Sequence, residues 1–295
     1  MVIFLFITSF FLSTALDQGL YFYGANSLPL ESPEEARILK ELSHKSPSRF
    51  KLTTKEKSLD DNGKPVWSVI SQEKIRIAKD SSMTIRKRES QVFPNRIFRE
   101  MVRTENGLYS FSEQGSWGLI RTGFSSRFLP LNLEGTITEY YPGGQLKSIS
   151  EYHNNQLITN QNWLSNGEKY IDSIFYSVDR EPKFKNTEAF FNQYILSKLS
   201  KSGMDLSQVQ DQLEIGWVVM ENGKLEGVIS LAGSSVDLKQ YMVKIIDEMP
   251  GDWEPAMLNG KAVRYFMSVP FNFQNYNTSF QDVELTPEVL FYNMY

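Results

Sequence analysis

The clearest periodic pattern of apolar and polar residues lies in the last third of the chain. Apolar residues recur at helical spacing from Asn186 to Leu199 and again from Val236 to Met249. They occupy every second position from Leu213 to Glu221 and from Val263 to Phe273, and an Asn-Gly dipeptide, which favours a tight hairpin turn, lies beside each of these segments. The pattern predicts the order α-β-β-α-β over residues 183–273, with helices on one face of a small antiparallel sheet.

Residues 131–178 show an internal repeat. An aromatic strand, a glycine turn and a return strand occur twice, and Gly144 and Gly167 hold equivalent positions 23 residues apart. Each copy predicts one β-hairpin that buries a face against its neighbour. Residues 16–130 are predicted to be β-rich, apart from a short helix at 32–43, where a serine and a proline suit the first positions of a helix. We therefore predict an α+β fold: an α-β-β-α-β region preceded by β-hairpin repeats and a β-rich N-terminal region.

The N-terminal residues 1–15 predict a signal peptide. The apolar run from Met1 to Leu16 is shorter than the roughly 20 residues that a membrane-spanning helix needs, and its small residues suit cleavage after Ala15. No basic residue precedes the run, so an uncleaved anchor is the alternative. We expect export to the periplasm, or else an inner-membrane anchor facing the periplasm, with membrane contact only through an uncleaved N-terminus.

Composition limits the chemistry that the chain can carry. It has no cysteine and two histidines, which excludes disulfides and thiolate metal sites and predicts no metal site and no cofactor. The formal net charge of −4 argues against nucleic acid as a partner, because phosphate binding needs clustered Lys and Arg. Neither a nucleophile-elbow motif nor a phosphate-binding glycine loop is present. The sequence therefore predicts a binding protein and not an enzyme.

Residues 183–273 resemble the TonB C-terminal domain, and residues 131–178 resemble MORN-type repeats of exported bacterial proteins. The TonB resemblance rests on a series of short motifs: Met249-Pro250, Trp253-Glu254-Pro255-Ala256, Asn259-Gly260-Lys261, Val263, and Val269-Pro270-Phe271-Asn272-Phe273. This resemblance implies a periplasmic domain that binds the N-terminal peptide of an outer-membrane TonB-dependent receptor. In that family the peptide adds as a strand beside the last strand of the sheet.

The predicted partner-binding site is the last strand of the chain, because an edge strand offers unpaired N–H and C=O groups to a partner strand. Pro270 has no N–H and should weaken the pairing where it lies. Alternate residues are expected to face the core, and the others are expected to contact the partner. The expected core residues are Val263, Tyr265, Met267 and Val269, and the expected contact residues are Arg264, Phe266 and Ser268.

Three functional hypotheses follow. The first is a periplasmic TonB-like protein that binds an outer-membrane receptor or another envelope partner by β-strand addition, with a link to TonB-dependent transport. The second is an envelope scaffold or adaptor whose repeats bind protein or cell-wall glycan without energy transduction, and the third is a glycan hydrolase. A dimer through edge strands is a further option. The aromatic tail, residues 274–295, is expected either to dock onto its own domain or to cover the edge strand until a partner displaces it.

Overall fold

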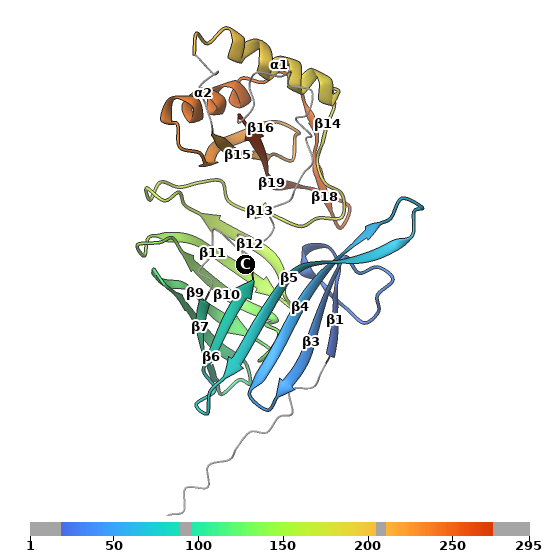
Figure 1. Cartoon of the computed structure of the whole chain (residues 1–295), viewed down its shortest axis with the longest axis vertical. Coiled ribbons are helices and arrows are strands. Elements are labelled where there is room, and N and C mark those ends of the chain that lie inside the picture. The colour runs from blue at the N-terminus through green and yellow to red at the C-terminus, as the bar shows by residue number, and fades with distance from the viewer. Residues whose placement is uncertain (1–18, 89–95, 205–210, 274–295) are drawn as a thin grey trace, which may run out of the picture.

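The computed structural model describes residues 19–88, 96–204 and 211–273. Its largest element is a twelve-stranded antiparallel sheet in which every strand from β3 to β12 pairs with the next along the chain (Figure 1). The strands are β1 (Gly19–Tyr23), β2 (Pro29–Leu30), β3 (Ile38–Ser46), β4 (Arg49–Leu59), β5 (Pro65–Ile77), β6 (Met83–Arg88), β7 (Arg96–Arg103), β8 (Tyr109–Gly115), β9 (Gly118–Ser125), β10 (Leu133–Tyr140), β11 (Leu146–His153) and β12 (Gln156–Asn162). Short turns connect most of them, so sequence neighbours become neighbours in the sheet.

This large sheet curves into a trough (Figure 1). Phe50, Ile75, Ile85 and Ile97 stand opposite one another on β4 to β7 and form one buried row. The same buried cluster extends from β3 to Ile137 on β10. Side chains on an uncovered face of a flat sheet stay exposed to solvent, so the burial of this row requires the sheet to curve around it. The cluster therefore lies on the concave face.

A buried ion network lies on the same face. Arg99, Glu113, Arg121 and Glu139 stand opposite one another on β7 to β10. Glu113 accepts from Nε of Arg99 at 2.7 Å and from Nε of Arg121 at 2.7 Å. Burial alone would raise the pKa of the Glu113 carboxyl, but the guanidinium groups of Arg121 and Arg99 outweigh it and hold that pKa well below its usual range.

The two ends of the large sheet are joined by side-chain hydrogen bonds. The short helix η1 (Ala25–Ser27) follows β1 and lies beside β12. The side-chain amide of Asn26 donates to the carbonyl oxygen of Leu157 at 2.8 Å. The side-chain amide of Asn155 donates to the carbonyl oxygen of Ser27 at 3.1 Å. These bonds hold the first and last strands of the trough together.

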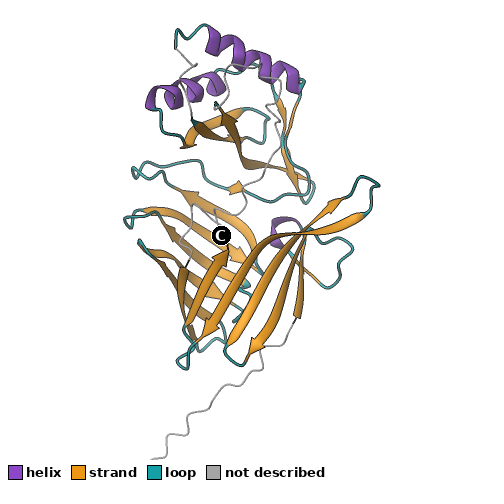
Figure 2. Cartoon of the chain, in the orientation of Figure 1, coloured by secondary structure: helices purple, strands orange, loops and turns teal. Residues whose placement is uncertain are grey.

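The C-terminal region forms a smaller sheet with both α-helices on one face (Figure 2). Its elements are β13 (Ile174–Phe175), β14 (Lys183–Phe184), α1 (Glu188–Ser200), β15 (Gln212–Val219), β16 (Leu225–Ala232), α2 (Val236–Asp247), β17 (Trp253–Glu254), β18 (Ala256–Leu258) and β19 (Lys261–Asn272). The order across the sheet is β13-β19-β15-β16, and β18 also pairs with β19. Trp217 of β15 is buried against Phe191 of α1 and belongs to the same core as Met242 of α2.

Side-chain caps define where the helices begin. Thr187 accepts a hydrogen bond from the backbone N–H of Phe190 at 3.2 Å, and Ser235 accepts one from that of Leu238 at 3.3 Å. Each cap satisfies one of the N–H groups that a first helical turn leaves without a partner. Neither helix in the described part of the chain is long and apolar enough to cross a membrane.

The predicted α+β fold class with a TonB-like arrangement is wrong. The protein is mostly β, and its dominant element is the twelve-stranded antiparallel sheet rather than a small sheet with helices. The repeat segment supplies β10, β11 and β12, which continue the sheet begun in the N-terminal region, so strands outweigh helices over the whole chain. The predicted signal peptide and aromatic tail lie outside the described residues.

The short helix predicted at 32–43 is also wrong. Ile38–Ser46 is strand β3, and it pairs with β1 on one side and β4 on the other. Leu39 and Leu42 lie on opposite faces of this strand, and both are buried. Two apolar residues three positions apart also occur on one face of a helix, which is why the sequence favours a helix here. In the structure, the same spacing arises because β3 is buried on both faces.

Candidate functional site

Strand β19, which contains the whole predicted site, is a central strand along part of its length. Residues from Tyr265 to Asn272 pair with β15, and residues from Lys261 to Val263 pair with β18. On the opposite edge, β13 pairs in parallel with Arg264 and Tyr265. The first part of the predicted edge, 263–265, is therefore occupied by the protein's own chain.

The direction of the backbone groups identifies the edge that stays open. The N–H of Phe273 donates to the carbonyl oxygen of Asp211 next to β15, and successive residues of a strand point their backbone groups to alternate sides. Odd-numbered residues of β19 thus face β15, whereas Phe266, Ser268 and Pro270 face outward. Among the described residues, no strand pairs with this outward edge between Phe266 and Pro270.

The side chains of β19 alternate between core and surface as the sequence predicts. Tyr265 is 2% exposed and Val269 is 4% exposed, and the partly buried Val263 and Met267 pack against the same apolar clusters. Burial raises the pKa of the Tyr265 hydroxyl. The prediction of core residues is confirmed for Tyr265 and Val269, whereas Val263 and Met267 are only partly buried.

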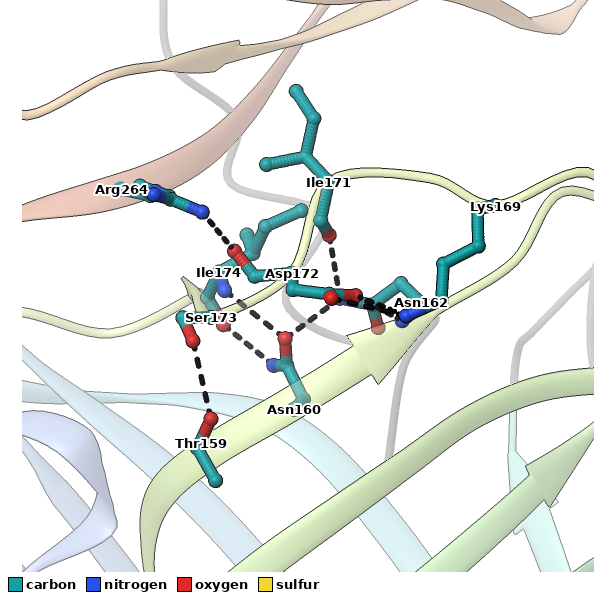
Figure 3. Close-up of polar contacts among 9 residues, drawn as sticks. All are labelled: Thr159, Asn160, Asn162, Lys169, Ile171, Asp172, Ser173, Ile174 and Arg264. Carbon is teal, nitrogen blue, oxygen red and sulfur yellow. Dashed lines mark hydrogen bonds and ion pairs between the residues drawn. The ribbon is translucent and has the colours of Figure 1, made fainter.

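Arg264 has a structural task. Its Nη1 donates to the carbonyl oxygen of Asp172 at 2.8 Å (Figure 3). Its Nε donates to the carboxylate of Glu221 at 3.0 Å. The guanidinium group therefore ties β19 to the segment that leads into β13. This use of Arg264 differs from the predicted contact with a partner.

Side chains at the end of β12 fix the position of β13 (Figure 3). Asn160 donates to the carbonyl oxygen of Ile174 at 2.7 Å and accepts from its N–H at 3.0 Å. The side chain of Asn162 donates to the carbonyl oxygen of Ile171 at 2.9 Å, and its N–H donates to Asp172 at 3.2 Å. Because β13 covers the start of β19, these asparagines set the point at which the open edge begins.

One face of the small sheet lies next to the open edge and carries two distinct groups of side chains. The ring of Phe266 packs over Gly216, where a Cβ atom would stand 2.5 Å from it, and lies 6.2 Å edge-to-face from the ring of Tyr176. The hydroxyl of Ser268 donates to the carboxylate of Glu214 at 2.8 Å. An apolar contact and a carboxylate therefore lie side by side along the edge.

Sequence reasoning missed Tyr176, Glu214 and Gly216. The only sequence signal was a glycine within the apolar alternation of the first C-terminal strand, since such a glycine often marks the close approach of another group. The positions of Tyr176 and Glu214 depend on how distant segments pair, which the sequence pattern does not specify.

The remaining edge of the small sheet is less open to pairing. β16 carries two irregularities in its pairing with β15, and the hydroxyl of Tyr170 donates to the carbonyl oxygen of Gly227. Bulges and covered backbone groups oppose strand addition. No group of three His, Cys, Asp or Glu side chains suited to a metal ion occurs within the described ranges. Comparison of this chain with protein-family models, with curated proteins and with solved structures finds no match.

Proposed function

We propose that this chain is a binding protein of the bacterial envelope that captures an extended segment of a partner along the outward edge of β19. The observation that carries the proposal is a difference between the two edges of this strand. On one edge β15 pairs with residues from Tyr265 to Asn272, whereas on the other β13 pairs only with Arg264 and Tyr265. The sequence resemblance points to the N-terminal peptide of an outer-membrane receptor as the first partner to test, and to the periplasm as the compartment.

The main-chain contribution to such binding is small. Ser268 offers an outward N–H and C=O, Phe266 and Pro270 each add a C=O, and the N–H of Phe266 faces β13. At about 1 kcal/mol net for each hydrogen bond, the four bonds supply about 4 kcal/mol, which corresponds to a millimolar Kd. Strand addition here is therefore weak and reversible unless side chains add to it.

The test uses the full chain, an N-terminal receptor peptide and backbone amide NMR. We expect the amide resonances of Phe266 to Val269 to shift at millimolar peptide, with little change in β16. In Ser268→Pro, which removes the outward N–H, binding should weaken at least about fivefold because one bond is lost and the ring blocks the edge.

The matched control is Ser268→Ala, which keeps the outward N–H and should retain binding. Circular dichroism of both variants checks that the fold is intact. Unchanged β19 resonances in the wild-type protein at millimolar peptide would overturn the proposal, as would equal binding by Ser268→Pro and Ser268→Ala.

A further inference from the structure

We infer that the captured segment carries an apolar or aromatic side chain two residues away from a basic one. The inference rests on the proposed function, because it assigns side-chain preferences to the same edge of β19. It is carried by the two groups of side chains on the sheet face beside that edge, Phe266 with Tyr176 and Ser268 with Glu214.

Phe266 defines the apolar position. The end of β13 and Tyr176 occupy the place directly opposite Phe266, so the nearest residue of an added strand stands opposite Ser268. Its side chain lies on the same face of the sheet, about 7–8 Å diagonally from Phe266, which an aromatic or long side chain can span. The ring of Phe266 is half-buried, supported beneath by Gly216 and beside by Tyr176. An aliphatic or aromatic side chain at this position gains apolar contact and covers the exposed part of the ring.

Glu214 defines the basic position. It stands opposite Pro270, yet its carboxylate reaches the hydroxyl of Ser268, so the negative charge lies over β19 itself. An added strand runs about 4.8 Å beyond β19, which a lysine or arginine side chain easily spans. A basic side chain opposite Pro270 can therefore approach this carboxylate.

Glu214 has no cationic partner in the parts of the chain that the structure describes. The nearby cation on the same strand, Arg264, is already bound to Glu221 and to the carbonyl oxygen of Asp172. The half-buried carboxylate thus attracts a cation from outside and repels an acidic side chain.

The spacing follows from the strand geometry. Ser268 and Pro270 are two residues apart on the same face, so the two matching positions of an added strand are also two residues apart, whichever direction it runs. The residue between them faces the opposite side of the sheet. The edge therefore prefers a short pattern of apolar, any residue, basic, or its reverse.

The test compares three short synthetic peptides on the full chain by fluorescence anisotropy. The first has the sequence Thr-Val-Thr-Phe-Thr-Lys-Thr-Val, the second replaces its lysine with glutamate, and the third replaces its phenylalanine with serine. We expect the lysine peptide to bind about fivefold more tightly than the glutamate peptide and about threefold more tightly than the serine peptide.

Variants of Glu214 identify the group responsible. Glu214→Lys should reverse the preference, so that the glutamate peptide binds more tightly than the lysine peptide, and the nearly isosteric Glu214→Gln should reduce the difference to less than about twofold. A lysine preference that survives in both variants overturns the inference. So does equal binding of all three peptides to the wild type.

The failure of the inference can be told apart from the failure of the proposed function. If all three peptides bind equally and Ser268→Pro weakens each of them, strand addition stands and the side-chain preference is wrong. If none of the three peptides nor the receptor peptide binds, or if Ser268→Pro leaves binding unchanged, both the proposed function and the inference fall.

Discussion

Removing the carboxylate of Glu113 should cost the large sheet a substantial part of its stability. Glu113 is 2% exposed and lies between Arg99 and Arg121, which are 6% and 9% exposed. In Glu113→Gln, the buried Arg99 loses its ion pair, and the buried Arg121 keeps only the carboxylate of Glu139, which stands opposite it. Breaking a buried ion pair in this way costs about 3–5 kcal/mol, a large share of the roughly 5–15 kcal/mol that stabilises a typical domain.

The assay is urea unfolding at neutral pH followed by far-UV circular dichroism, which reports mainly on the large sheet in this mostly β chain. Glu100→Gln is the matched control, since Glu100 is exposed on the neighbouring strand β7 and should change the free energy of unfolding by less than about 0.5 kcal/mol. A triple variant, Arg99→Met, Glu113→Leu and Arg121→Met, should recover most of the loss, because removing a whole buried network is often neutral.

The same carboxylate gives the sheet a defined acid dependence. The folded-state pKa of Glu113 lies below its unfolded value, which is near 4.3, so its contribution is present above about pH 4.3 and is lost as the pH falls further toward the folded-state pKa. Glu113→Gln should lack this part of the acid dependence. A loss in Glu113→Gln as small as that in Glu100→Gln would refute the reasoning.

Three further predictions address other parts of the chain. Gly223→Ala should lower the free energy of unfolding, measured in urea, by about 2–3 kcal/mol, because φ is +80° and a Cβ atom would lie 2.1 Å from the carbonyl oxygen of Trp253. In the control Gly260→Ala the added Cβ atom meets no other atom, and the loss should be only about 1 kcal/mol. Lys40→Met should stabilise the protein by about 1–3 kcal/mol at pH 7, because burial lowers the pKa of Lys40 to about 8 and its charged form destabilises the folded state. This gain should fade between about pH 8 and 10.5 when urea unfolding of the variant and the wild type is compared at each pH. Arg264→Met should speed amide exchange at Phe175 by about fivefold, because β13 loses its tie to β19; unchanged exchange would contradict that role.

Local patterns in the sequence predict the individual elements better than their assembly. The second predicted helix corresponds to α2 (Val236–Asp247), the first predicted C-terminal strand to β15 (Gln212–Val219), and the first copy of the repeat to the hairpin of β10 and β11. These depend on periodicity and turn residues, which act over a few positions. The second copy does not form the predicted hairpin, because its return strand, β13, pairs with β19. The N-terminal strands and the hairpins join into one sheet through pairing between segments. The sequence of a segment does not indicate which other segment it pairs with.

The repeat segment illustrates this limit. Residues 131–178 look separable in the sequence, yet β10 contributes Ile137 to the core of the trough and Glu139 to its ion network. Deleting the segment would remove Ile137 from the buried cluster and a carboxylate beside Arg121. Such a deletion therefore measures the stability of the sheet, and surface substitutions are the appropriate way to test whether the hairpins bind a partner.

The proposed binding edge of β19 is likewise predicted only in part by the sequence. The alternation of β19 predicts which side chains enter the core, as Tyr265 and Val269 do. It does not predict that β13, a two-residue strand held by Asn160 and Asn162, covers the start of the edge. The sequence does not indicate that the asparagines at the end of β12 hold β13 in place. Nor does it indicate that β13 pairs with β19, which lies about a hundred residues after those asparagines.

The shortness of the open edge has a consequence for how it can work. A long, flat, unpaired strand edge promotes aggregation, and natural proteins limit such edges with proline, bulges and covering segments. Here β13 covers one end, Pro270 removes an N–H at the other, and Tyr170 covers a carbonyl on β16. Each feature that protects the protein from indiscriminate pairing also removes main-chain bonds from a partner. Selectivity at this edge must therefore come from side chains, and Phe266 and the carboxylate of Glu214 are the groups placed to provide it.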